Sequence, residues 1–226
     1  MTTESTVPTR SRVSKVLIVD DHPIVREGLS ALISTQSDLE VCGHAEGATE
    51  AIRILEAKKP EVVIVDISLQ DSSGLDLIRQ IRAREENICI LVSSMYDESL
   101  YAERALRAGA MGYINKQEAT RNILTAIRRV LTGKVFLSDR MSDRLLERVV
   151  GSANSPDQSP VEALSDRELE VFSLIGNGLT TSEIAERLNL SVKTIETYRQ
   201  RIKEKLALRN AADLARHASQ WVLESA

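Results

Sequence analysis

Aromatic residues and cysteines are both scarce in this sequence. Aromatics make up 3% of its 226 residues, so any hydrophobic core must be built from Leu, Ile, Val and Ala. The two cysteines, Cys42 and Cys89, both lie inside apolar runs. We therefore expect buried, reduced thiols, because two such cysteines are poor material for a disulfide framework or a metal site.

Long hydrophobic runs are also missing. No apolar run approaches the roughly 20 residues that a membrane-spanning helix needs, so the sequence predicts no membrane partner. Residues 1–13 are rich in Ser and Thr and include Arg10 and Arg12, but they contain no apolar segment of the kind found in signal peptides. We expect a disordered leader and a cytoplasmic protein.

The charge of the chain is unevenly distributed. A formal net charge of −4 argues against a general nucleic-acid binder. Residues 193–209, however, contain six lysines and arginines and only two glutamates. A local excess of positive charge on one segment is the pattern that nucleic-acid contacts require, so this segment is a candidate interface.

Residues 15–132 alternate short apolar runs with longer amphipathic patterns. The apolar runs are 15–20, 39–44, 61–66, 88–94 and 111–115, and helical spacing follows at 24–32, 48–57, 75–84, 98–107 and 119–131. Five such units with near-continuous apolar strands predict a parallel sheet with helices on both faces. The right-handed crossover rule then favours an α/β doubly wound fold.

The chain changes character after residue 133. Residues 137–150 can form one amphipathic helix, and 151–160 are a polar linker that contains Pro and Ser. Beyond the linker all patterns are helical: capping boxes begin at Ser165 and Thr180, Ser191 caps a helix over 192–206, and a last helix covers 211–219. We divide the chain into a leader (1–13), an α/β domain (14–133), a linker helix and flexible linker (134–160), and a small all-α domain (161–226).

Side chains with phosphoryl-transfer chemistry follow four of the five predicted strands. Asp20 and Asp21 follow the first, Asp66 the third, Ser94 the fourth and Lys116 the fifth. In a parallel sheet these ends meet at one edge, where ligands bind. One or two carboxylates suit Mg²⁺, a further carboxylate can attack phosphorus, and an ammonium and a hydroxyl can each contact a phosphoryl oxygen. The joint placement predicts a phosphoryl site.

A helix-turn-helix is predicted in the C-terminal domain. Residues 183–188, 189–191 and 192–206 have the lengths of a first helix, a tight turn and a recognition helix. The apolar positions expected to face inward are Ile184, Ala185, Leu188, Leu190, Val192, Ile195, Ile202 and Leu206. The positions of 192–206 that are expected to face outward include Lys and Thr side chains, which suit contacts with DNA phosphates. They also include Glu196, which can accept a hydrogen bond from a cytosine amino group, and Gln200, which can pair with adenine.

The segment 14–133 closely resembles response-regulator receiver domains. The motifs that carry the resemblance are VDDHPIVREGL, EVVIVDISLQDSSG, LVSSMYDE and the run from Gly112 to Lys116. The family usually has Met-Pro where this chain has Leu69-Gln70, and threonine is commoner than Ser94 at its position. Loss of the proline predicts a more flexible loop after Asp66.

The resemblance implies a role for each residue of the predicted site. It implies that Asp66 accepts the phosphoryl group, assisted by Lys116 and Ser94, and that Ser94 and Tyr113 are the switch pair, with Tyr113 moving inward after Ser94 is recruited. It implies Mg²⁺ as the cofactor, bound by Asp20, Asp21, Asp66 and the backbone carbonyl of Ser68.

Residues 161–222 resemble the LuxR-type helix-turn-helix of the NarL/FixJ regulators, on the stretch LSDRELEVFSLIGNGLTTSEIAERLNLSVKTIETYRQRIKEKL. By this resemblance Glu196, Thr197 and Gln200 face the bases, whereas Lys193, Thr194, Tyr198 and Arg201 lie toward the DNA backbone. In the family the last helix pairs two DNA-binding domains. The last helix of this chain contains small residues, Ala211, Ala215 and Ala218, that suit such pairing. The same residues could instead pack inward and complete the core of their own domain.

We therefore predict a two-component response regulator. Phosphorylation of Asp66 by a sensor histidine kinase controls dimerisation and sequence-specific binding to double-stranded promoter DNA, so the phosphorylated homodimer regulates transcription, with RNA polymerase as a further partner. The chain is not expected to be an enzyme beyond self-directed phosphoryl transfer and autodephosphorylation.

Two alternatives come from other functional classes. One is a Mg²⁺-dependent phosphotransferase or phosphatase with an aspartyl-phosphate intermediate. Such an enzyme needs a cap over its substrate and an acid two residues after the nucleophile, but no insertion supplies a cap and Ser68 stands at that position. The other is a DNA binder whose receiver is a passive dimerisation module. The intact acid cluster argues against it, whereas Gln70 keeps it open.

Overall fold

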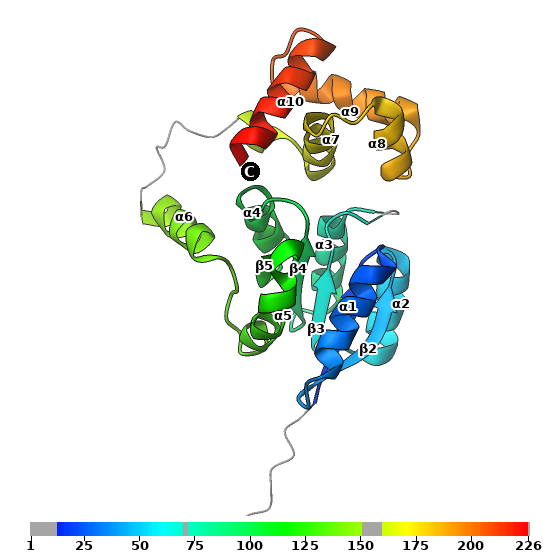
Figure 1. Cartoon of the computed structure of the whole chain (residues 1–226), viewed down its shortest axis with the longest axis vertical. Helices are drawn as coiled ribbons and strands as arrows, with labels where there is room; N and C mark the ends of the chain where they lie inside the picture. The colour runs from blue at the N-terminus through cyan, green and yellow to red at the C-terminus, as the bar shows by residue number, and fades with distance from the viewer. Residues whose placement is uncertain (1–12, 70–71, 151–159, 226) are drawn as a thin grey trace, which may run out of the picture.

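A computed structural model describes residues 13–69, 72–150 and 160–225 of the chain. It contains an N-terminal α/β domain and a C-terminal helical domain, which stand against each other (Figure 1). The predicted disordered leader and flexible linker fall almost entirely outside the described residues, as does Gln70. Within the described ranges, no helix is long and apolar enough to span a membrane.

The N-terminal sheet has five strands, all parallel, as the sequence predicts. They are β1 (Ser14–Val19), β2 (Leu39–Ala45), β3 (Val62–Val65), β4 (Cys89–Ser94) and β5 (Gly112–Asn115), in the spatial order β2-β1-β3-β4-β5. The chain first steps from β1 to β2 and then crosses to β3 on the other side of β1, so the order reverses between β1 and β3. Ligands bind beyond the carboxyl ends of strands at such a reversal.

Helices cover both faces of the sheet (Figure 1). One face packs against α1 (Pro23–Ser34) and α5 (Lys116–Leu131), and the other against α2 (Ala48–Lys58), α3 (Gly74–Arg84) and α4 (Glu98–Ala108). Side chains alternate along β1, so that Val16 and Ile18 join one core and Leu17 and Val19 the other. Both cores are almost entirely aliphatic, as the shortage of aromatic residues requires.

The helix predicted over 137–150 is shorter, because α6 begins at Asp139 (Asp139–Val150). The chain before it is tied to the sheet edge: Tyr113 donates its backbone N–H to the Phe136 carbonyl over 2.9 Å. The Ser138 hydroxyl then accepts from the Met141 N–H at 3.1 Å, which is the bond that a helix cap makes. These two constraints hold Leu137 outside the helix.

The cysteines are free, as predicted, but they are half-buried and not fully buried. Cys42 lies on the edge strand β2, and Cys89 is the first residue of β4, so neither reaches the centre of a core. Partial burial raises the pKa of both thiols, which disfavours the reactive thiolate.

The C-terminal domain contains α7 (Asp166–Gly176), α8 (Thr181–Arg187), α9 (Val192–Lys205) and α10 (Ala211–Ser225), preceded by a 3₁₀ turn (Pro160–Ala163). Both predicted capping boxes are present: Ser165 pairs with Glu168 and Thr180 with Glu183. Ser191 caps α9 by accepting from the Thr194 N–H. These local signals place α8 and α9 in the predicted helix-turn-helix arrangement.

Three apolar residues at or near the ends of α9 are less buried than predicted. Val192 was expected to face inward but is 45% exposed, because it is the first residue of α9 and precedes the turn that packs on α8. Leu190 and Leu206, at the two ends of α9, are half-buried, whereas Ile195 and Ile202 in its middle are fully buried.

The last helix extends to Ser225, six residues beyond the predicted end. Ala218 is fully buried, and its carbonyl lies so close to Gly176 of α7 that a Cβ there would be 2.5 Å away. Ala218 therefore completes the core of its own domain. Ala211 is exposed and Ala215 is half-buried, so of the three alanines only these two remain accessible for pairing with a second domain.

The two domains are joined by ion pairs and hydrogen bonds along α3, α4 and the start of α7. Asp166 accepts from Arg79 at 2.5 Å and from Arg104 at 2.9 Å. Arg104 also donates to the Leu164 carbonyl over 2.8 Å. These contacts hold the amino-terminal end of α7 against the α/β domain.

The loop after Asp66 is closed by a tight approach of α3. A Cβ added to Gly74, the first residue of α3, would lie 2.0 Å from the Asp66 carbonyl oxygen. We expect Gly74→Ala to lower the free energy of unfolding by about 1–3 kcal/mol, since the backbone must shift to admit the methyl group. Chemical denaturation followed by circular dichroism measures this change.

Gly28 of α1 is a matched control. A Cβ at Gly28 meets nothing within 4 Å, and the residue lies inside an exposed helical turn. Gly28→Ala should be neutral or stabilise the protein by up to about 1 kcal/mol through helix propensity. Equal stability of the two alanine variants would contradict the packing described here.

Candidate functional site

Two buried aspartates lie side by side at the carboxyl edge of the sheet. Val19 pairs with Val65 in the register of β1 and β3, so Asp20 and Asp66 follow at the same level. The Asp66 N–H donates to the Val19 carbonyl over 2.9 Å, which fixes this alignment. Asp20 is 2% exposed and Asp66 is 3% exposed, whereas Asp21 is half-buried. The predicted carboxylate cluster is therefore formed.

Lys116 lies between these two carboxylates. Its Nζ is 2.7 Å from Asp20 Oδ2 and 2.6 Å from Asp66 Oδ2, and its side chain is almost buried. As predicted, Lys116 follows the fifth strand, β5; it is also the first residue of α5, which Asn115 caps. Two buried anions without a cation would be costly, so Lys116 is the group that makes the pair tolerable.

The environment of Asp66 favours its protonated form. Burial is the main cause and the Asp20 charge adds to it, while Lys116 and a hydrogen bond from the Ser68 backbone act in the opposite direction. Together these effects raise the pKa of Asp66 to about 6. A carboxylate that is poorly solvated, and whose Oδ1 has no hydrogen-bond partner among the described residues, retains its capacity to bond a new group.

The cluster has the donor set of a divalent-cation site. Asp20, Asp21, His22 and Asp66 each offer a ligand atom, and these atoms lie within 4.8 Å of one another. Hard carboxylate oxygens of this kind are the ligands that Mg²⁺ prefers in proteins, so the donor set of the cluster fits this ion. His22 was not predicted as a ligand. It is 61% exposed, and its Nδ1 lies 2.6 Å from Asp21 Oδ1.

The predicted switch residues, Ser94 and Tyr113, both form a hydrogen bond with the backbone of Tyr96. Ser94 is buried at the end of β4 and its Oγ accepts from the Tyr96 N–H at 3.3 Å. The Tyr113 hydroxyl donates to the Tyr96 carbonyl over 2.7 Å. The Tyr113 ring is 1% exposed, so it already occupies the inward position that was expected to follow phosphorylation. Tyr96 itself stacks on Tyr101, with ring centroids 4.7 Å apart.

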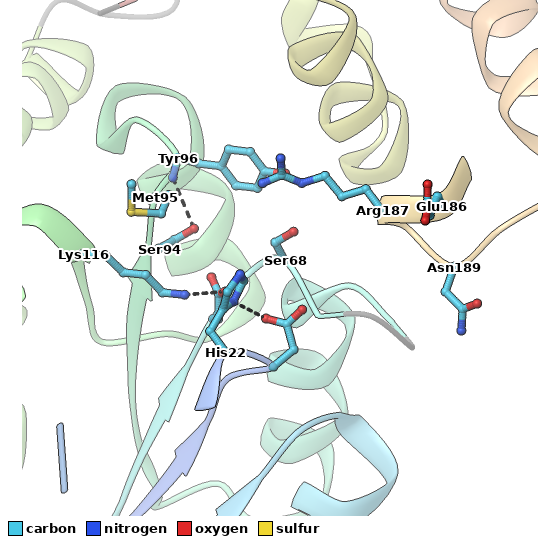
Figure 2. Close-up of a pocket in the computed structure, with 11 residues that line it drawn as sticks. His22, Ser68, Ser94, Met95, Tyr96, Lys116, Glu186, Arg187 and Asn189 are labelled. Atoms are coloured by element: carbon cyan, nitrogen blue, oxygen red, sulfur yellow. Dashed lines mark hydrogen bonds and ion pairs between the residues drawn. The ribbon is translucent and has the colours of Figure 1, made fainter. Parts of the chain in front are cut away.

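A cavity of about 590 Å³ opens above the aspartates, and both domains line it (Figure 2). The α/β domain contributes Asp21, His22, Asp66, Ser68, Ser94, Met95, Tyr96 and Lys116. The helical domain contributes Glu186 and Arg187 from α8 and Asn189 from the following turn. The sequence had not predicted that residues of the helix-turn-helix reach this site.

Glu170 of α7 is a second residue that the sequence did not reveal. It is 2% exposed and pairs with Arg167 at 2.7 Å. One of its carboxylate oxygens lies 3.5 Å from both the Ser68 hydroxyl and the Tyr96 hydroxyl, across the domain boundary. Burial raises the pKa of Glu170, and the Asp66 charge raises it further. A charged residue on the apolar face of α7 was the only available signal.

The predicted DNA-contacting residues lie together on α9. Lys193, Glu196, Thr197, Gln200 and Arg201 are exposed, while Thr194 and Tyr198 are half-buried. The helix lies on the side of its domain away from the sheet (Figure 1). Its outward face is therefore open to a ligand in this arrangement, although the first domain stands against α7 and α10.

The raised pKa of Asp66 has a consequence for stability that can be measured without metal. The carboxyl is protonated below about 6 in the folded chain but only below its ordinary value of 3.8 when unfolded. Between these values the folded state binds the extra proton, so stability falls as pH rises. Relative to Asp66→Asn, the unfolding free energy of the wild type should fall by about 2 kcal/mol from pH ~4 to ~7 in EDTA.

Denaturant titrations of both proteins at a series of pH values provide this difference. The asparagine variant keeps the shape of the side chain and removes its titration, so ionising groups away from the site cancel. A difference that is flat or that rises with pH would show that Asp66 is not held in a poorly solvated site.

Comparisons with known proteins agree with this architecture. The family described as response regulator receiver domain matches residues 16–128, and that described as bacterial regulatory proteins, luxR family, matches residues 162–218. The chain is 36% identical to the oxygen regulatory protein NreC of Staphylococcus haemolyticus over 208 residues, which are 90% of this chain and 96% of that protein.

Solved structures give the same result. A two-component response regulator of the LuxR family from Aurantimonas sp. SI85-9A1 is 33% identical and aligns with a TM-score of 0.57 over 61% of this chain and 99% of its own. RcsB of Salmonella typhimurium is 27% identical and aligns with a TM-score of 0.66 over 92% of this chain and 98% of its own. The chain therefore belongs to the two-component response regulators that join a receiver domain to a LuxR-type helix-turn-helix domain.

Proposed function

We propose that Asp66 is the phosphoacceptor and that a sensor histidine kinase is its donor. The observation that carries this proposal is the unpartnered Oδ1 of a buried Asp66, which shares the cavity with Lys116. In the reaction a bond forms between this oxygen and phosphorus, while the phosphorus–nitrogen bond of a phosphohistidine breaks and the imidazole takes a proton. The product is an acyl phosphate on the receiver.

Each neighbouring group has a task in this reaction. Asp20, Asp21, Asp66 and the Ser68 backbone carbonyl would hold Mg²⁺, which offsets the charge of the phosphoryl oxygens when it is bound. Lys116 already contacts Asp66 and can move its ammonium to a phosphoryl oxygen. Ser94 can donate its hydroxyl to another phosphoryl oxygen, since its Oγ is the acceptor in its bond with the Tyr96 N–H. The chemistry is self-directed, and slow autodephosphorylation is the only hydrolysis that we expect.

Incubation of the full chain with Mg²⁺ and acetyl phosphate tests the site. We expect the wild type to gain the mass of one phosphoryl group and Asp66→Asn to gain none. Asp76→Asn is a suitable control, because Asp76 is an exposed acid on α3 of the same domain. An unchanged mass of the wild type, or equal modification of the Asp66 variant, would exclude Asp66 as the acceptor.

We propose that the output is binding of a phosphorylated homodimer to promoter DNA. RcsB from Salmonella enterica serovar Typhimurium has been solved bound to promoter DNA in the presence of the phosphomimetic BeF₃⁻, at 27% identity and a TM-score of 0.61 to this chain. Here Trp221 and Val222 of α10 share a cavity with Leu100 and Tyr101 of α4. Separation of the domains would expose this end of α10 for pairing. The regulator would act in the cytoplasm, with RNA polymerase as a further partner.

The contacts of α9 divide into two classes with different expected effects. Lys193 and Arg201, with Thr194 and Tyr198, would bind phosphates, whereas Glu196, Thr197 and Gln200 would face bases. The Gln200 amide now donates to Glu204 over 2.7 Å, so it must exchange this bond for one to a base. Phosphate contacts act on every sequence alike, but base contacts act only on the preferred one.

Binding of the phosphorylated chain to DNA selected from a random library separates these classes. Lys193→Ala should weaken binding to all sequences alike and lower the slope of log affinity against log salt by about 1. Gln200→Ala should cost about 1–3 kcal/mol on the selected site and relax the preference at one base pair. Lys58→Ala, an exposed lysine on α2, is the control. Equal losses for Gln200→Ala on selected and scrambled DNA would contradict a base-reading role.

A further inference from the structure

The phosphoacceptor cavity is built from both domains, and its helical side carries opposite charges. Arg187 and Glu186 of α8 stand at the cavity, and Glu170 of α7 lies behind Ser68 and Tyr96. Neither α7 nor α8 belongs to the receiver domain. The groups that an approaching phosphoryl group meets therefore include side chains of the DNA-binding domain.

Arg187 is a cation directed into this site. Its side chain extends from α8 toward Tyr96 (Figure 2). Within the described parts of the chain, its guanidinium makes no hydrogen bond and no ion pair, so its donors are available to a ligand. A guanidinium is planar, always charged and presents donors that match phosphate oxygens. Arg187 is exposed, so water screens part of its charge.

Glu170 is an anion held close to the same place. Its carboxylate lies 3.5 Å from the hydroxyl of Ser68, which is two residues after Asp66. Burial raises the pKa of Glu170, and the Asp66 charge raises it further. Glu170 is 2% exposed, so its charge is screened by water much less than that of Arg187.

Tyr96 experiences both charges at once. Burial raises the pKa of its hydroxyl, the Glu170 charge raises it further, and the Arg187 charge opposes this change. The same residue bonds Ser94 through its N–H and Tyr113 through its carbonyl. Tyr96 is therefore the point where the switch residues of the receiver and the charges of the DNA-binding domain meet.

We propose that the DNA-binding domain completes the phosphoacceptor site, with Arg187 attracting the incoming phosphoryl group and Glu170 repelling it. This inference rests on the proposed phosphorylation of Asp66. Glu170 has the stronger effect because it is buried, although Arg167 offsets part of its charge. Closed domains therefore slow phosphorylation. The same repulsion acts on the phosphoryl group once it is bonded to Asp66, so phosphorylated Asp66 in turn favours separation of the domains.

Substitutions at Glu170 and Arg187 distinguish an effect of charge from a loosening of the contact between the domains, because only charge predicts opposite changes in the rate of phosphorylation. The initial rate of phosphoryl gain with acetyl phosphate and Mg²⁺ is measured by mass spectrometry on the full chain. We expect Glu170→Gln to react about tenfold faster than the wild type and Arg187→Gln about threefold slower, the sizes that a poorly and a well screened unit charge produce. Arg187→Glu should be slower still.

The control removes an acid from the same domain at a distance from the cavity. Glu204 is exposed on α9, so Glu204→Gln should react at the wild-type rate. Arg187 is exposed, so its variants remain informative even if Glu170→Gln folds poorly.

Rates that change in the same direction for Glu170→Gln and Arg187→Gln would mean that both only loosen the interface. Unchanged rates would mean that the DNA-binding domain takes no part, and either result overturns the inference while Asp66 remains the acceptor. A wild type that gains no phosphoryl group would instead refute the proposed function on which the inference rests.

Discussion

The ion pairs of Lys116 with Asp20 and Asp66 are the contacts on which the rest of the site depends. Two carboxylates buried at the ends of neighbouring strands repel each other, and their burial is tolerable only with a cation between them. Lys116 Nζ lies within 2.7 Å of an oxygen of each. It occupies Oδ2 of Asp66 and leaves Oδ1 without a partner among the described residues. The same ammonium thus stabilises the folded site and leaves one oxygen of Asp66 open.

The fold brings these groups together through its strand order. Reversal of the order between β1 and β3 places Asp20 beside Asp66, and the helix after β5 starts with Lys116. The close approach of Gly74 to the Asp66 carbonyl closes the loop beneath the cavity. The second domain then rests on α3 and α4 through Asp166, so that α7 and α8 meet the open side of the cavity. A change of charge at Asp66 therefore occurs beside the contact between the domains.

Much of the fold and of the receiver site could be predicted because their signals are local or periodic. Apolar runs followed by helical spacing predict five parallel strands, and such strands place Asp20 and Asp66 at one edge. Capping boxes at Ser165 and Thr180 fix two helix starts. Glu170 and Arg187 were not predicted, because their roles arise from packing between domains. Glu170 contacts Ser68, 102 residues earlier in the chain, and no periodicity in either segment encodes that contact. The exposure of Val192 and the start of α6 at Asp139, two residues later than predicted, likewise depend on tertiary neighbours.

The central claim is that charge at Asp66 and closure of the two domains oppose each other. Hydrogen–deuterium exchange on the wild-type chain, with and without Mg²⁺ and BeF₃⁻, tests it most directly. The account predicts faster exchange at the contact between the domains, in Pro160–Ala163 and the first turn of α7, while amides of β1 and β3 stay protected. Unchanged or slower exchange at that contact, with the phosphoryl mimic bound at Asp66, would contradict it.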